Sequence, residues 1–327
     1  MTVPLFLALS LLGLAILPLA LLLASLVDLA LADRSSLPRS RAVLFFALYL
    51  ACELSGIVAA AAVWFALLGG RAVGHERYLA ANAALQRVWA SALLFGALRI
   101  YSMRLVVEGS ESGQRGPVLF FVRHSSTADT VLVAAVIAGP HRLQLRYVLK
   151  RELLWDPCLD IVGLRLPNAF IDRASARSEE ELEAIAQLGR GLDESSGVLI
   201  YPEGTRYSEP KRVAAIERLR TRGQGELADI AAGYRSVLPP RTGGPLALLS
   251  AATDADVIFV EHVGLEGAAS FSQFWRGALV GQTLRVRLRR ILSADIPALS
   301  RERWLFEQWR ETDNWITTSS TQPAVLP

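Results

Sequence analysis

Two long apolar segments dominate the start of the chain. Residues 1–27 contain no charged side chain, and within residues 42–70 the only charged one is Glu53. Since a helix of about 20 apolar residues can cross a bilayer, we predict a transmembrane helical hairpin over residues 1–70. A cleaved signal peptide is the alternative for the first segment, but its apolar run is too long and no Lys or Arg precedes it.

Two further helices are predicted outside these segments. Residues 78–102 contain only two charged side chains. We expect a helix within residues 71–102 that either lies at the membrane interface or packs on the protein core. Near the other end of the chain, RERWLFEQWRETDNWI predicts an amphipathic helix that ends at residue 316. We expect residues 317–327 to form a disordered tail.

Between residues 103 and 316, short apolar runs alternate with helical segments. The runs VLFFV, LRYVL, VGLRLPNAFI, GVLIY, ADVIFVEHVG and QTLRVRLRRIL are typical of strands, and residues 127–138 and 177–192 are typical of helices. This alternation predicts an α/β domain over residues 103–316, built from a mixed sheet flanked by helices. A basic, helix-prone insert at residues 208–241 interrupts it.

Charge and cysteine content restrict the partners. The formal net charge is +3, and the whole excess lies in residues 71–327, because residues 1–70 hold three Arg and three acidic residues. A basic domain next to a membrane suits anionic head groups, whereas no nucleic-acid-binding module is visible. Cys52 and Cys158 form no C-x-x-C motif, so neither a disulfide framework nor a cysteine-based metal site is expected.

The first candidate for chemistry is the stretch VLFFVRHSSTAD. It places His124 just beyond a strand, where α/β folds commonly bind ligands, and Asp129 in the first turn of the next helix. That carboxylate can reach back to the imidazole, fix its tautomer and stabilise the imidazolium. The alternative is structural, because STAD also fits a capping box in which Asp129 only caps the helix.

The second candidate is GVLIYPEGTRYSEP, which again places a polar turn after a strand. Gly204 lets backbone N–H groups approach an anion, and Arg206 offers a planar fork for phosphate oxygens. Glu203 would orient Arg206 or the turn itself. Lys150 and Arg173 follow two other strands and are weaker candidates for the same anion, although each is also explained as a solvated surface charge.

Taken in order, these blocks resemble the glycerolipid acyltransferases, a family that includes the 1-acylglycerol-3-phosphate acyltransferases. HSSTAD is similar to the H-x4-D motif of the family, AFIDR to its second block and YPEGTR to its third. LPPRTGG and the Trp-rich last helix resemble a membrane-anchored subgroup. The resemblance covers roughly residues 100–316. Arg123 stands where the family often has Asn, and Pro167 and Asn168 replace a more Gly-rich approach to the second block.

The resemblance implies transfer of a fatty acyl group from acyl-CoA or acyl-carrier protein to the hydroxyl of a lysophosphatidate. It implies His124 as general base and Asp129 as its orienting partner. It implies no cofactor and no metal; acyl-CoA or acyl-carrier protein is a co-substrate. The residues implied in holding the substrate phosphate are Glu203, Gly204, Thr205, Arg206, Arg173 and Lys150. Arg241, in LPPRTGG, is a further residue suggested by the family alone.

Lipid substrates imply a site that opens at the level of the bilayer. We therefore expect a multi-pass protein of a bacterial inner membrane, with its catalytic domain in the cytoplasm, where the activated acyl donor is found. Other acceptors within the class are another lysophospholipid or glycerol 3-phosphate. Outside the class, the chain could be a phospholipid hydrolase in which His124 activates water, or a lipid-binding membrane protein without catalysis.

Overall fold

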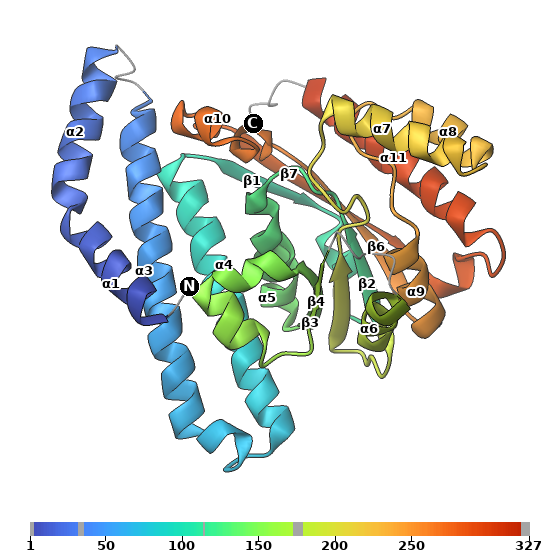
Figure 1. Ribbon diagram of the computed structural model, residues 1–327, viewed down its shortest axis with the longest axis horizontal. Coiled ribbons are helices and arrows are strands. Elements are labelled where there is room, and N and C mark those ends of the chain that lie inside the picture. Colours follow the sequence, from blue (N-terminus) through green and yellow to red (C-terminus); the bar gives the residue numbers. More distant parts are fainter. Residues whose placement is uncertain (1–2, 32–35, 114, 173–178, 322–327) are drawn as a thin grey trace.

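The computed structural model describes residues 3–31, 36–113, 115–172 and 179–321. At its centre lies a seven-stranded sheet of order β1-β7-β6-β2-β5-β3-β4 (Figure 1). From β6 to β4 all neighbouring strands are parallel, whereas β7 runs antiparallel to β6 and parallel to β1. The prediction of a mixed sheet is confirmed. The strands are β1 (Arg104–Glu108), β2 (Val118–Val122), β3 (Gln144–Lys150), β4 (Ala169–Ile171), β5 (Ser196–Ile200), β6 (Asp256–Val263) and β7 (Thr283–Ile291).

Helices cover both faces of this sheet. The α-helices are α1 (Val3–Ala15), α2 (Leu17–Ala30), α3 (Pro38–Ala66), α4 (His75–Ile100), α5 (Gly139–His141), α6 (Glu179–Gly189), α7 (Glu209–Thr221), α8 (Gly225–Ala232), α9 (Gly243–Ala251), α10 (Phe271–Trp275) and α11 (Arg301–Thr321). On one side α6, α8, α9 and α11 pack on the sheet, and on the other α4 and the helical segment Thr127–His141 do so (Figure 1).

Strand β2 carries no polar residue because both of its faces are buried. Leu119 and Phe121 belong to the core on the α11 side, whereas Val118, Phe120 and Val122 belong to the core on the α4 side. All five are fully buried. A strand covered on both faces is a continuous apolar run, as in parallel sheets. All five residues of β5 are buried as well, so both strands that precede the candidate motifs lie inside the sheet core.

One strand prediction is wrong in its extent. VGLRLPNAFI was expected as a strand, but only Ala169–Ile171 pairs with β3, and Leu159–Gly163 forms a π-helical turn. Pro167 has no N–H for a ladder. Asn168 instead accepts a hydrogen bond from Tyr147 N and donates one to Gly163 O, at 2.8 and 2.9 Å. Strand β1, at the edge of the sheet, was not predicted.

The first apolar segment is not one straight helix. Helices α1 and α2 meet at a bend of 54°. Pro18, in the first turn of α2, explains the break, because proline cannot donate the helical hydrogen bond and clashes with the preceding turn. Within the described residues, only α3 is by itself long and apolar enough to cross a membrane, and the bent pair counts as a second span only if taken together.

Helix α3 packs against the α/β domain through one of its faces. Glu53, fully buried at its middle, accepts hydrogen bonds from Trp89 Nε1 at 3.0 Å and from Cys158 N at 3.3 Å. One turn before it, Tyr49 donates to Asp156 Oδ2 at 2.8 Å. Positions 49, 53, 56 and 60 share one face of the helix, and that face is therefore docked on the domain.

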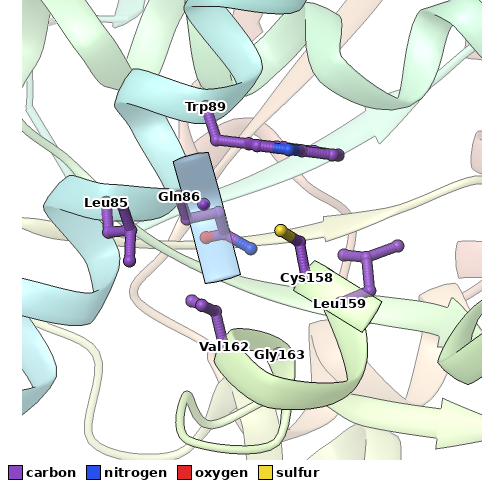
Figure 2. A pocket seen from close by; sticks show the side chains of 8 residues that line it. Leu85, Gln86, Trp89, Cys158, Leu159, Val162 and Gly163 are labelled. Atoms are coloured by element: carbon purple, nitrogen blue, oxygen red, sulfur yellow. The ribbon is translucent and has the colours of Figure 1, made fainter. Parts of the chain in front are cut away.

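A glycine makes this approach possible. A Cβ at Gly56 would lie 2.6 Å from Cys158 Sγ, closer than van der Waals contact allows. Trp89, Cys158 and Val162 line a small cavity at the same junction (Figure 2). The residues that follow Lys150 are thus packed directly against the N-terminal helices.

The two remaining helix predictions have different outcomes. Helix α4 buries Ala90, Leu94 and Leu98 against the sheet, so the helix expected within residues 71–102 packs on the core. The prediction of a disordered tail is wrong for residues 317–321, which continue α11. Ile316 is buried and Ser320 donates a hydrogen bond to its carbonyl oxygen at 2.8 Å, which ties the last turn to the helix. Residues 322–327 lie outside the described part of the chain.

Candidate active site

The carboxyl ends of the parallel strands gather the candidate residues at one edge of the sheet. His124 follows β2, Glu203 and Arg206 follow its neighbour β5, and Lys150 ends β3 on the other side of β5. His262 lies near the end of β6, which pairs with β2 on its other side. Arg173 lies outside the described residues, so its predicted role has no structural account.

Asp129 performs both functions that its sequence position suggested. Its Oδ1 lies 3.0 Å from His124 Nδ1, while its Oδ2 accepts hydrogen bonds from Ser125 N at 2.7 Å and Ser126 N at 2.9 Å. The capping box is also present, with Ser126 Oγ accepting from Ala128 N at 3.2 Å. The cap and the imidazole contact use different oxygens, so the two interpretations do not compete.

This contact fixes the tautomer of His124. An ionised carboxylate only accepts hydrogen bonds, so Nδ1 carries the proton and the lone pair lies on Nε2. No side chain in the described residues forms a hydrogen bond with Nε2, and the His124 side chain is 11% exposed. The Tyr201 ring packs beside the imidazole, with 4.8 Å between ring centroids, and its hydroxyl donates to Asp129 O at 3.2 Å. Nε2 is therefore positioned to take a proton from a bound molecule.

Glu203 joins three loops and does not contact Arg206. Its Oε1 accepts from His124 N at 2.8 Å and its Oε2 from Leu238 N at 2.9 Å. Burial raises the pKa of Glu203 to about 7, against the lowering effect of these two N–H groups. The prediction that this carboxyl orients Arg206 is wrong, whereas the alternative that it orients the turn agrees with its contacts.

Because Gly204 has no side chain, a second cationic side chain, that of Arg241, can approach the turn after β5. Gly204 adopts φ +67°, and a Cβ there would lie 2.8 Å from Arg241 Nε. Arg241 N donates to Pro202 O at 2.8 Å, which holds this arginine beside the turn. Sequence analysis named Arg241 only as a residue suggested by the family and gave it no role. The only signal for it was the LPPRTGG resemblance.

The other predicted phosphate ligands have partners of their own. Arg206 is exposed and donates to Ala269 O at 3.1 Å, and Thr205 Oγ1 accepts from Lys211 Nζ at 3.2 Å. Both lie on the turn that Glu203 holds against His124. Lys150 Nζ pairs with Glu152 at 2.6 Å, and the structure gives it no contact with that turn.

A buried histidine behind the site was missed by sequence reasoning. His262 Nε2 lies 3.1 Å from Arg123 O and 3.7 Å from Asp129 Oδ2. Burial lowers the pKa of His262, although Asp129 opposes this, so the ring is neutral and Nε2–H donates to the carbonyl. Arg123 in turn donates to His262 O and Glu266 Oε1, both at 2.5 Å. Arg123, which stands where the family often has Asn, thus attaches the loop that carries His124 to β6 and to Glu266.

A His–carboxylate pair at a strand end, next to a turn rich in guanidinium groups, is suited to removing a proton from a hydroxyl near an anion. Residues 104–260 match the family model described as Acyltransferase. This match spans 157 of the 327 residues and confirms the resemblance drawn from the motifs. Within the described residues, no group of three His, Cys, Asp or Glu side chains is placed to hold a metal ion.

Two particular proteins are similar to this chain. The mouse protein named 1-acyl-sn-glycerol-3-phosphate acyltransferase epsilon is 25% identical over 183 residues, which are 55% of this chain and 49% of that protein. The match thus spans about half of the length of this curated relative. The crystal structure of PlsC, the 1-acyl-sn-glycerophosphate acyltransferase of Thermotoga maritima, superposes with a TM-score of 0.55 at 15% identity, over 87% of this chain and 99% of that one. At that identity the likeness shows a shared fold.

Proposed function

We propose that this protein is a membrane-attached O-acyltransferase that moves a fatty acyl group from a thioester donor, acyl-CoA or acyl-carrier protein, to the hydroxyl of a lysophosphatidate. The observation that carries the proposal is the geometry of His124. Its Nδ1 is held by Asp129, no side chain of the described residues forms a hydrogen bond with its Nε2, and its backbone N donates to Glu203 of the turn after β5. The names of the mouse and Thermotoga relatives support the choice of acceptor.

The proposed reaction proceeds by direct attack. His124 Nε2 takes the proton of the acceptor hydroxyl while that oxygen attacks the thioester carbonyl carbon, and Asp129 stabilises the resulting imidazolium. The tetrahedral intermediate then collapses, the carbon–sulfur bond breaks, and the leaving thiolate receives the proton from His124. General base catalysis of this kind contributes typically about 10²–10⁴-fold in rate. The products are phosphatidate and the free thiol of the donor.

The phosphate of the acceptor would lie at the turn formed by Gly204, Thr205 and Arg206. Arginine forks bind phosphate oxygens in a bidentate manner. Arg241, held beside Gly204, adds a second guanidinium to this turn. Lys150 is a weaker candidate for binding this phosphate, because Glu152 already pairs with its ammonium group. Arg173 remains a prediction from sequence.

Attachment to the membrane has its support in the N-terminal helices. Helices α1 and α2 expose a set of leucines to the outside: Leu5, Leu9, Leu11, Leu12, Leu19, Leu22, Leu23, Leu26 and Leu29. Phe46 of α3 and Phe271 of α10 are also exposed, with ring centroids 6.4 Å apart. Aromatic side chains favour the interface between lipid and water. The loop that precedes α10 accepts the hydrogen bond from Arg206, which brings the phosphate turn close to these aromatic residues.

We further propose that the protein resides in a bacterial inner membrane with the α/β domain facing the cytoplasm, where thioester donors are made. The test is a panel with the purified full chain in detergent, offering lysophosphatidate, other lysophospholipids and glycerol 3-phosphate with each donor. We expect donor-dependent conversion of lysophosphatidate, and its loss in His124→Ala. Consumption of lysolipid without a donor would show a hydrolase, and an unchanged His124→Ala activity would refute the proposed role.

A further inference from the structure

The segment 235–238 connects the C-terminal helix to the candidate active site. On the helix side of this segment, Asp313 in the middle of α11 accepts hydrogen bonds from three successive backbone N–H groups. Its Oδ1 accepts from Arg235 N at 3.0 Å, Ser236 N at 2.6 Å and Val237 N at 3.2 Å, and its Oδ2 accepts from Arg235 N at 3.0 Å. Asp313 is 2% exposed. The Asp313 carboxylate thus accepts the backbone hydrogen bonds of residues 235–237 that neighbouring strands would accept in a sheet.

The same segment holds the catalytic loop from its other end. Leu238 N donates to Glu203 Oε2, and the second oxygen of Glu203 accepts from His124 N. Ser236 O also accepts a hydrogen bond from Arg123, the residue before His124, at 3.5 Å. A continuous path of hydrogen bonds therefore runs from Asp313 through residues 235–238 and Glu203 to the backbone of His124.

Two prolines stiffen the continuation of this segment to the phosphate turn. Pro239 and Pro240 are buried and separate Leu238 from Arg241. Each proline has a fixed φ, so a shift of residues 235–238 is passed on to Arg241. Tyr234, just before the segment, donates to Phe306 O of α11 at 2.6 Å. Helix α11 therefore fixes both the base and the second guanidinium of the site.

We propose that Asp313 is a positioning residue for acyl transfer, and that α11 forms part of the active-site scaffold although it lies beyond the matched residues 104–260. This inference rests on the proposed function for its kinetic consequence. Its structural consequence, the immobilisation of the His124 loop, is independent of which reaction is catalysed.

The test is Asp313→Asn, with Asn314→Ala as the matched control, because residue 314 is the exposed neighbour on the same helix. The asparagine oxygen can keep the place of Oδ1, but the amide NH2 then faces the N–H of Arg235 in place of Oδ2, and because two donors repel each other we expect the segment to shift. Misplacement by about 1 Å costs roughly 100-fold in rate. We expect kcat to fall by about 10- to 100-fold with the KM for the donor unchanged, and Asn314→Ala to match the wild type.

A double-mutant cycle with Glu203→Gln separates positioning from a general loss of stability. Residues that act through one segment are non-additive, so the double variant should lose less than the product of the two single losses. Hydrogen exchange gives a readout without activity: the peptide containing His124 should exchange faster in Asp313→Asn and not in Asn314→Ala. Unchanged exchange at His124, or independent effects on kcat, would overturn the inference. If the wild type transfers no acyl group, the proposed function fails while the exchange result still decides this one.

Discussion

Replacing Asp129 by asparagine separates the two functions of that carboxylate. The backbone N–H groups of Ser125 and Ser126 both point at Oδ2, so the asparagine oxygen takes this position. The amide NH2 then faces His124 Nδ1 and donates to it. The imidazole must adopt the opposite tautomer, with its proton on Nε2, and can no longer accept the proton of a hydroxyl.

The magnitudes follow from these contacts. Loss of the general base costs about 10²–10⁴-fold in kcat, which is roughly 3–5 kcal/mol of transition-state stabilisation. Stability changes little, because the cap is retained, and we expect a loss of about 1 kcal/mol. In Asp129→Ala, the two buried N–H groups lose their acceptor at about 1–3 kcal/mol each. The two variants should thus be equally inactive and differ in stability.

The assay compares kcat and urea unfolding for wild type, Asp129→Asn and Asp129→Ala in the same detergent. Equal activity losses with a stability difference of a few kcal/mol support the assignment. If Asp129→Asn retained activity within tenfold of the wild type, the tautomer argument would be refuted. If both variants unfolded equally easily, the cap would not be made by Oδ2.

Further predictions concern the turn, the buried carboxyl and the membrane surface. Arg206→Ala should raise the KM for lysophosphatidate by at least tenfold with little change in kcat, and an unchanged KM would contradict a phosphate contact. The raised pKa of Glu203, about 7 against an ordinary 4.5, means that its ionisation opposes folding. Its contribution to stability is fully present below pH 4.5 and is lost as the pH rises through 7, by about 3 kcal/mol in all. Unfolding of the wild type should therefore become easier across this range, relative to Glu203→Gln; parallel curves would contradict the raised pKa. Both native cysteines are buried, so a fluorophore can be attached to one introduced, exposed cysteine. On Phe271→Cys its emission should shift to the blue when vesicles of anionic phospholipid are added, whereas on Glu217→Cys of α7 it should not.

The fold was predictable where one sequence signal decides the structure. VLFFV and GVLIY are apolar throughout because helices cover both faces of β2 and β5, and a short apolar run followed by a polar turn is typical of such a buried strand. VGLRLPNAFI misled because its first two residues end a π-helical turn and Pro167 has no N–H for a ladder, so only its last three residues form a strand. Strand β1 was missed because an edge strand needs little apolar sequence: its residues are exposed or half-buried.

The candidate site was predictable only for residues near one another in sequence. His124 and Asp129 belong to one turn, so their contact follows from helix geometry. Leu238 is 35 residues from Glu203, and Asp313 is 78 residues from Arg235. Such partners depend on how the strands are ordered and the loops closed, and an isolated Asp in a Trp-rich helix gives no indication of either.

The contact between Glu53 and the domain bears on any attempt to prepare a soluble fragment. A chain cut after residue 66 would leave Trp89 Nε1 and Cys158 N without their acceptor, on a surface shaped to receive Gly56. Such a fragment would expose apolar side chains and unsatisfied donors together, and we expect it to aggregate. Helix α3 is thus part of the protein's own interior, and its removal would require a rebuilt segment after Lys150.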